Sequence, residues 1–201
     1  MSNNDIVVIG GESDNDMKCM TLIDEYIISL TKKKAPVVLY IPTANGDDPL
    51  KILDFRNKYS EAGCSVIELV FFTPPFLHSQ QILLMFERAD IIYIAGGNTR
   101  AMLAVWREFG VIDLLKEAGD QGKVLCGVSA GAICWFDFGH SDSGGTFALI
   151  HGLGLLRGAL CPHFNSEEGR ETSFVELICN QHINPAYAVD EGLSDFLCAG
   201  R

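Results

Sequence analysis

The chain has 201 residues, of which 48% are hydrophobic and 20% are charged. This length suits one domain, and the apolar content excludes a largely disordered protein. With 15 basic and 26 acidic residues the formal net charge is −11. A negative charge repels phosphates and so disfavours nucleic-acid partners. No apolar stretch reaches the roughly 18 residues that a membrane span needs. We therefore expect a single domain over residues 1–201 that binds neither nucleic acid nor membrane.

Short apolar segments alternate with longer segments of helical period, a pattern typical of an α/β fold with a mostly parallel, doubly wound sheet. The predicted strands, in chain order, are Ile6–Ile9, Val37–Ile41, Ser65–Val70, Asp90–Ala95, Val124–Val128 and Ala186–Val189. The predicted helices are Met17–Leu30, Leu50–Ala62, Ser79–Ala89, Thr99–Phe109, Val111–Ala118 and Ser173–Gln181. The glycine-rich segment from Gly139 to Cys161 has no clean period and is expected to form a hairpin or long loop over one end of the sheet.

The N-terminus and the cysteines both favour a cytoplasmic protein. Met1–Asp5 leads directly into an apolar strand without the basic and apolar regions of a signal peptide. The cysteines are odd in number and include no C-x-x-C pair, so we expect reduced thiols in the core. They are Cys19, Cys64, Cys126, Cys134, Cys161, Cys179 and Cys198. Cys161, two residues before His163, is the one candidate for a reactive thiol.

The strongest chemical signal is the G-x-S-x-G sequence Gly127–Gly131, which lies between a predicted strand and a predicted helix. This is the setting of a nucleophile elbow, in which a sharp turn lifts the serine hydroxyl above the carboxyl edge of the sheet. The same residues would also fit a plain turn with a helix-capping serine. In this context we interpret Ser129 as a nucleophile.

A serine hydroxyl needs a positioned base, normally a histidine that a carboxylate orients. Of the five histidines, His163 is placed best, because it follows an apolar segment at what should be the end of a strand. His140 is closer to Ser129 in sequence but is expected at the far end of the helix that follows the elbow. A purely structural role for His163 fits the sequence equally well.

Two backbone N–H groups are candidates for an oxyanion hole. One belongs to Ala130, directly after the serine. The other belongs to Gly97, in a G-G-N-T turn where tandem glycines allow the backbone to approach a substrate. A simple strand-to-helix turn with Asn98 as the N-cap residue fits the same sequence equally well.

The G-G-N-T turn, the G-x-S-A-G-A elbow about 30 residues later and the following P-H-F together resemble the dipeptidase E (aspartyl dipeptidase) family of serine peptidases, which is related to cyanophycinase. The resemblance implies a fold similar to class I glutamine amidotransferases and a triad in the chain order serine, acid, histidine. It matches Ser129 to the nucleophile, His163 to the base and Gly97 to an oxyanion donor. Asp142 is the best-spaced acid, because Asp137 should still lie on the elbow helix; Glu167 and Glu168 are substitutes.

The resemblance also implies the substrate: a short peptide, in particular a dipeptide with an acidic first residue. Arg170 is the nearest cation for that side chain, with Arg157 and His140 as others, and Asn98 is a second candidate for substrate binding. A surface ion pair with Glu167 or Glu171 is an equally simple role for Arg170. No cofactor or metal is implied, and a homo-oligomer is compatible with the sequence.

Two alternatives use the same elbow differently. A carboxylesterase of the α/β-hydrolase type would usually be longer and would carry its histidine late in the chain. A non-catalytic binding domain on a flavodoxin-like scaffold would use Ser129 only as a helix cap, but it would leave the co-occurrence of the glycine turn, the elbow and the histidine unexplained.

Overall fold

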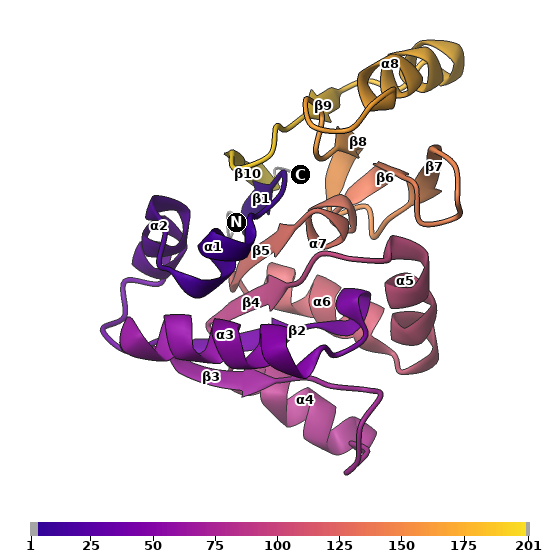
Figure 1. Ribbon diagram of the computed structural model, residues 1–201. Helices are drawn as coiled ribbons and strands as arrows, with labels where there is room; N and C mark the ends of the chain where they lie inside the picture. The colour runs from indigo at the N-terminus through magenta and orange to yellow at the C-terminus, as the bar shows by residue number, and fades with distance from the viewer. Residues whose placement is uncertain (1–3, 200–201) are drawn as a thin grey trace.

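Six strands form a mostly parallel sheet through the centre of the molecule (Figure 1). The computed structural model describes residues 4–199, without the side chains of residues 4, 14, 15 and 195–199. The strands lie in the order β10, β1, β5, β4, β2, β3, with β10 antiparallel to β1 at one edge. Their bounds are β1 (Asn4–Ile9), β2 (Val37–Ile41), β3 (Ser65–Glu68), β4 (Ile91–Ile94), β5 (Val124–Val128) and β10 (Ser194–Ala199). The first five strands agree with the prediction to within two residues, whereas β10 was not predicted.

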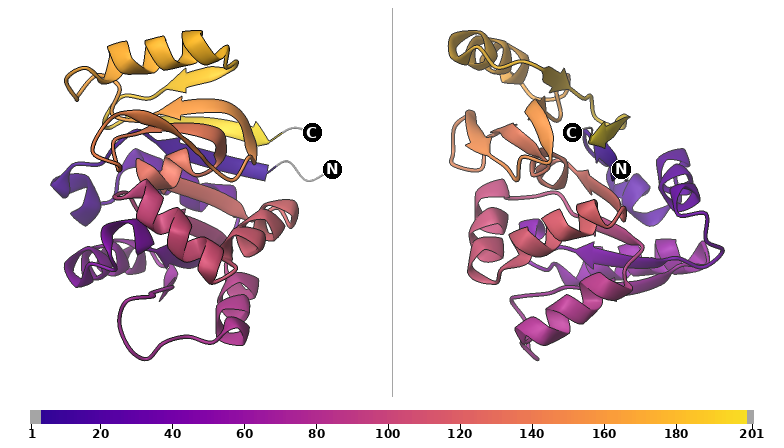
Figure 2. Two further views of the ribbon diagram at one scale, coloured as in Figure 1. Left: turned by 90° about the vertical axis from the view of Figure 1, so that its right-hand side faces the viewer. Right: turned by 180° about the vertical axis from the view of Figure 1, so that it is seen from behind.

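Helices cover both faces of this sheet (Figure 2). They are α1 (Asp14–Lys18), α2 (Leu22–Leu30), α3 (Pro49–Glu61), α4 (Ser79–Arg88), α5 (Thr99–Glu108) and α6 (Val111–Asp120). In β1, Ile6 and Val8 join the core under α4–α6, while Val7 and Ile9 join the core under α2 and α3. Alternate side chains of one strand are thus buried on opposite faces, which explains why the strands are continuously hydrophobic.

One predicted helix is broken in two. The helix expected over Met17–Leu30 is interrupted between α1 and α2 by Thr21, whose hydroxyl accepts a hydrogen bond from the backbone N–H of Asp24 (3.2 Å). The Asp24 carboxylate accepts in return from the N–H of Thr21 (3.0 Å). This reciprocal capping box starts a new helix inside an otherwise continuous helical period.

A second sheet was not predicted. It has the order β7, β6, β8, β9 and stands beside the carboxyl ends of the central strands, with α8 (Arg170–Gln181) outside it (Figures 1 and 2). Its strands are β6 (Phe136–Ser141), β7 (Ala148–His151), β8 (Leu156–Cys161) and β9 (Ala186–Ala188). The hairpin expected within Gly139–Cys161 is present as β6 and β7, but β8 adds a parallel strand beside β6. The strand predicted at Ala186–Val189 belongs to this sheet and not to the central one.

The helix after the elbow is much shorter than predicted. α7 (Ala130–Ile133) has four residues, and the chain enters β6 two residues later. Asp137 and His140 therefore lie on a strand, which corrects their expected place on a helix. α8 begins at Arg170, three residues before the predicted start at Ser173.

The thiols are only partly where they were expected. Four of the cysteines are buried and unpaired: Cys64, Cys126, Cys134 and Cys161. Cys19 and Cys179 are exposed, contrary to the expectation of core positions. The side chain of Cys198 lies outside the described residues. Among the helices in residues 4–199, none has the length and apolar character to cross a membrane.

The register of the parallel strands brings three glycine-containing turns together. Ile9 at the end of β1 pairs with Val128 at the end of β5, and Ile94 at the end of β4 pairs with Gly127. The turns that follow β1, β4 and β5 consequently meet at one edge of the sheet, as expected for the carboxyl ends of parallel strands.

Candidate active site

Ser129 occupies a sharp turn between β5 and α7. Its φ of 52° and ψ of −109° are unusual for a residue with a side chain, and such a conformation costs about 1–3 kcal/mol. A Cβ on Gly127 would overlap the backbone of Gly131, and one on Gly131 would overlap the carbonyl of Ile94. The two glycines of the motif are therefore required by the close packing of the turn.

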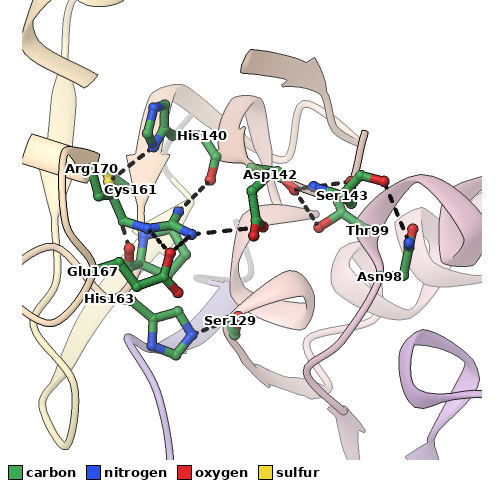
Figure 3. Close-up of polar contacts among 12 residues, drawn as sticks. Asn98, Thr99, Ser129, His140, Asp142, Ser143, Cys161, His163, Glu167 and Arg170 are labelled. Carbon is green, nitrogen blue, oxygen red and sulfur yellow. Dashed lines mark hydrogen bonds and ion pairs between the residues drawn. The ribbon is translucent and has the colours of Figure 1, made fainter. Parts of the chain in front are cut away.

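His163 reaches the serine from the second sheet. It follows β8 by two residues, and its Nε2 lies 2.9 Å from Ser129 Oγ (Figure 3). Its backbone N–H donates to the carbonyl of Gly10 (3.2 Å), which joins the loop after β8 to the turn after β1. A Cβ on Gly11 would come within 2.5 Å of His163 Cε1 and 2.6 Å of Nδ1. The glycine thus leaves the space that the imidazole ring fills.

The two candidate oxyanion donors flank the serine. Gly97 has a φ of 142°, and a Cβ there would overlap the carbonyl of Ala44, so the turn after β4 needs a glycine at this point. Gly97 and Ser129 line one cavity, and Ala130 begins α7 directly after the serine. Within the described part of the chain, no hydrogen bond occupies the N–H of Gly97 or of Ala130. Both groups are free to donate to a developing oxyanion.

Asn98 acts as a helix cap in the structure. Its Oδ1 accepts from the N–H of Ala101 (2.9 Å) at the start of α5, and its Nδ2 donates to the carbonyl of Ser143 (3.4 Å). The described residues that line the cavity include Gly97 but not Asn98. These contacts support the capping role, and a contact between Asn98 and substrate stays a prediction.

The structure does not bring Asp142 to His163. The Asp142 carboxylate, 63% exposed, faces the guanidinium of Arg170 at 3.7 Å (Figure 3). Asp142 and His163 both line the cavity, but the group that the Asp142 carboxylate faces is the guanidinium. Among residues 4–199, no hydrogen bond or ion pair joins a carboxylate to His163, so neither Asp142 nor its substitutes Glu167 and Glu168 takes the expected position.

Arg170 is already fully engaged within the protein. Its Nε and Nη2 donate to the Glu167 carboxylate (2.9 and 2.5 Å), and its Nη1 donates to the carbonyl of His140 (3.3 Å). The guanidinium also lies over the ring of Phe147, 4.8 Å from its centre, and the side chain is 3% exposed. Of the two roles considered from the sequence, the ion pair with Glu167 is therefore present, but it is buried on the arginine side and not a surface pair.

His140 and Cys161 form a buried polar pair behind this arginine. His140 Nδ1 lies 3.4 Å from Cys161 Sγ, and its Nε2 lies 3.0 Å from Ser173 Oγ. Burial lowers the pKa of His140 to about 4, and the nearby positive charge of Arg170 acts in the same direction. Burial raises the pKa of the Cys161 thiol to about 12. A neutral buried thiol is a poor nucleophile, which argues against the reactive Cys161 considered above.

Glu191 is a carboxylate that the sequence interpretation missed. A Cβ on Gly11 would lie 2.6 Å from His163 Nδ1 and 3.1 Å from Glu191 Cγ, so the glutamate stem and the imidazole both lie next to Gly11. The backbone N–H of Glu191 donates to the side chain of Asn165, two residues after His163 (3.4 Å). No sequence motif marks this residue, because its position depends on the pairing of β9 with β8.

A cavity of about 330 Å³ opens over the Ser129–His163 pair. Its lining combines acidic, basic and aromatic side chains, among them Glu12, Tyr40, Lys51, Phe55, Lys58 and Tyr93. The volume lies at the small end of the range for ligand pockets, about 300–1,000 Å³. In the part of the chain that the structure describes, no group of three His, Cys, Asp or Glu side chains is arranged to hold a metal ion.

Comparison with known proteins identifies the family. A model of peptidase family S51 matches residues 6–196. The chain belongs to peptidase family S51. An uncharacterized peptidase of Bacillus subtilis (strain 168), YgaJ, is 36% identical over 187 residues, which cover 93% of this chain and 80% of YgaJ.

Two solved structures of similar proteins share the fold. A protein of Listeria monocytogenes EGD-e, provisionally assigned as a peptidase E, has a TM-score of 0.70 at 19% identity, covering 99% of this chain and 96% of its own. A peptidase from an acI-B1 Actinobacterium has a TM-score of 0.74 at 17% identity, covering 99% and 88%. The predicted class I glutamine amidotransferase-like α/β fold is confirmed. Membership of family S51 supports a peptidase and favours it over the esterase and the non-catalytic binding domain.

Proposed function

We propose that this family S51 member is a serine-type exopeptidase that cleaves short peptides after a free N-terminal residue and favours an acidic residue there. The observation that carries the proposal is the 2.9 Å contact between Ser129 Oγ and His163 Nε2 on a strained elbow. In the tautomer with hydrogen on Nδ1, the serine hydroxyl donates to Nε2, which is the geometry that general-base catalysis requires.

The reaction then follows acyl transfer. Ser129 Oγ attacks the carbonyl carbon of the first peptide bond while His163 Nε2 takes the hydroxyl proton. The N–H groups of Gly97 and Ala130 stabilise the tetrahedral oxyanion. Collapse breaks the C–N bond, and the imidazolium gives its proton to the leaving amine. A water molecule, activated by the same imidazole, hydrolyses the acyl-serine and releases the first amino acid.

For the orienting acid we propose Glu191 in place of Asp142. The stem of Glu191 and Nδ1 of the His163 ring both lie next to Gly11, whereas Asp142 is directed to Arg170. The experiment is a pair of matched amide variants. Glu191→Gln should lower kcat by about 10²-fold or more, while Asp142→Asn should have a much smaller effect. The opposite order would return the role to Asp142.

For the acidic side chain of the substrate, we propose Lys51 as the cation. Lys51 lines the cavity, and within residues 4–199 no ion pair or hydrogen bond occupies its ammonium group, in contrast to Arg170. Lys51→Gln should lower kcat/KM for Asp-Leu about tenfold or more and leave Ala-Leu nearly unchanged, because only Asp-Leu loses a charge-assisted bond. Equal rates of the wild-type protein on Asp-Leu and Ala-Leu would contradict the acidic preference while leaving the serine mechanism intact.

The test of the proposed function as a whole is hydrolysis by the Ser129→Ala protein. We expect wild-type protein to release the first residue from a panel of X-Leu dipeptides and Ser129→Ala to release none. Ser29→Ala is a matched control, because this serine is exposed on α2 and its hydroxyl donates only to the carbonyl of Tyr26 (2.7 Å). Turnover by Ser129→Ala near the wild-type rate would contradict the proposal.

A further inference from the structure

Three carboxylates line the cavity over Ser129, and two of them, Asp142 and Glu167, face Arg170, which leaves one without a cationic partner among the described residues. This residue, Glu12, follows Gly11, the glycine against which the His163 ring packs. Consecutive Cα atoms are about 3.8 Å apart, so Glu12 begins one residue from the glycine that contacts the catalytic base. Both Glu12 and Ser129 line the cavity. The side chain is thus placed to contact a group on the substrate close to the bond that is cleaved.

Glu12 is held in place by a single protein donor. The hydroxyl of Tyr93, on β4, donates to Glu12 Oε1 at 2.6 Å. Burial raises the pKa of the Glu12 carboxyl, and this effect is opposed by Lys58 and by the bond from Tyr93. Within the described residues, no ion pair involves Glu12. The carboxylate therefore lacks a direct counter-ion, an arrangement that is costly unless a ligand supplies the positive charge.

The lysine whose charge acts on Glu12, Lys58, forms its own contacts with other groups. The ammonium of Lys58 donates to Asp24 Oδ2 (3.1 Å) and to the carbonyl of Asp16 (2.9 Å), and both side chains of the Lys58–Asp24 pair are 2% exposed. The Asp24 carboxylate also accepts from the hydroxyl of Tyr59 (2.7 Å). Because Lys58 and Asp24 neutralise one another, Glu12 leaves an excess negative charge at this end of the cavity.

Aromatic rings complete the surroundings of Glu12. Tyr40, Phe55 and Tyr93 line the cavity, with Tyr40 stacked on Phe55 at 3.9 Å between ring centres and Phe55 edge-on to Tyr93 at 4.8 Å. Phe55 also stacks on Tyr59 (4.3 Å between ring centres), so both of its faces are covered by other rings. A carboxylate among such apolar surfaces gains from a positive group on a ligand and disfavours a second carboxylate.

We infer that Glu12, oriented by Tyr93, binds the α-ammonium group of the substrate and so restricts cleavage to the first residue of a peptide. The inference rests on the proposed function for the identity of the substrate. Glu12 would recognise the amino terminus of the substrate, whereas Lys51 would contact the side chain of its first residue. An Asp-X dipeptide would then present its α-ammonium group to Glu12 and its side-chain carboxylate to Lys51.

The test is a binding measurement with the catalytically silent Ser129→Ala protein, so that it does not depend on turnover. The two probes are Ala-Leu and propionyl-Leu, which have nearly the same size but differ in the α-ammonium group. We expect Ser129→Ala to bind Ala-Leu more tightly. Adding Glu12→Gln should weaken Ala-Leu by about 10- to 100-fold, the value of a hydrogen bond to a charged group, and leave propionyl-Leu unchanged.

Two further variants separate local contact from other effects. Glu25→Gln removes a carboxylate from the exposed surface of α2 and should change neither affinity. Glu12→Asp keeps the charge and should retain part of the preference, which provides a readout if Glu12→Gln does not fold. Equal affinity of the Ser129→Ala protein for both probes, no measurable binding of Ala-Leu, or equal loss of both probes in Glu12→Gln would overturn the inference. Failure of the proposed function would appear separately, as dipeptide hydrolysis that survives Ser129→Ala.

Discussion

Gly11 should be essential for activity although it is neither a nucleophile nor a donor. A Cβ at this position would lie 2.5 Å from His163 Cε1 and 2.6 Å from Nδ1, whereas carbon atoms in good contact are about 3.5–4.0 Å apart. The φ of Gly11 does not lie in the left-handed region, so alanine can adopt the backbone conformation. The Gly11→Ala substitution should therefore displace the imidazole ring of His163 and leave the backbone conformation unchanged.

The displacement sets the size of the expected effect. To restore a normal contact, the His163 ring must move by roughly 1 Å, away from its 2.9 Å contact with Ser129 Oγ. A misplacement of about 1 Å costs on the order of 10²-fold in rate, which corresponds to about 2.7 kcal/mol in the activation barrier. The free energy of unfolding should change by only about 1 kcal/mol, because the displaced ring lies at the rim of a cavity.

The assay compares kcat/KM for a dipeptide with the midpoint of thermal unfolding in the same preparations. Gly144→Ala is the matched control, since its added Cβ would meet only the flexible side chain of Arg100 (2.9 Å from Nε), and it should keep near-wild-type activity. If Gly11→Ala keeps kcat/KM within a factor of three of wild type, or loses activity only in proportion to unfolded protein, then Gly11 does not act by leaving space for the His163 ring.

Two more predictions concern the oxyanion donor and the buried histidine. Gly97→Ala should lower kcat by about 10²–10³-fold with little change in KM, because the overlap with the Ala44 carbonyl would displace a donor to the transition state; steady-state kinetics with an unchanged kcat would contradict this. His140 stays neutral in the folded protein down to about pH 4, against 6.5 for an ordinary histidine, so the unfolded chain binds more protons between these values. Stability should therefore fall as the pH is lowered from 6.5 to 4, by about 3 kcal/mol at the lower limit. The free energy of unfolding should be measured with urea at several pH values in this range for the wild type and for His140→Gln. The decrease caused by His140 should be present in the wild type and absent from His140→Gln. Equal slopes of unfolding free energy against pH in the two proteins would contradict a neutral, buried His140.

The central sheet could be predicted because its strands are buried on both faces. A continuous apolar segment between helical periods has few other structures open to it, and Val37–Ile41 and Val124–Val128 match β2 and β5 at both ends. Ser129 and His163 were both predicted after strand ends, and they come one residue after β5 and two residues after β8. The glycines that the elbow requires are visible as a motif in the amino-acid sequence itself.

The second sheet was missed because its first strand begins in an apolar segment that suits a helix equally well. Phe136–Ser141 does alternate between apolar and polar residues in its first half, and Asp137 accepts from the N–H of Gly158 in β8 (2.9 Å). That alternation was the available signal for a strand. Reading it as helix placed both Asp137 and His140 wrongly.

The carboxylates of the site could not be ranked from sequence. Asp142 has suitable spacing from Ser129, but the guanidinium of Arg170 is the group that it faces. Glu191 comes near the turn after β1 through the pairing of β9 with β8. Long-range pairing of this kind leaves no local pattern, so residue spacing alone could not bring Glu191 into consideration, and the identity of the orienting acid stays a prediction.

Reaction with a fluorophosphonate, followed by mass spectrometry of the peptides, would show whether Ser129 is an activated nucleophile. We expect a single covalent adduct on the peptide that contains Ser129, with labelling abolished in Ser129→Ala and strongly slowed in His163→Gln. An adduct on another residue, or labelling of Ser129 that does not depend on His163, would contradict this expectation.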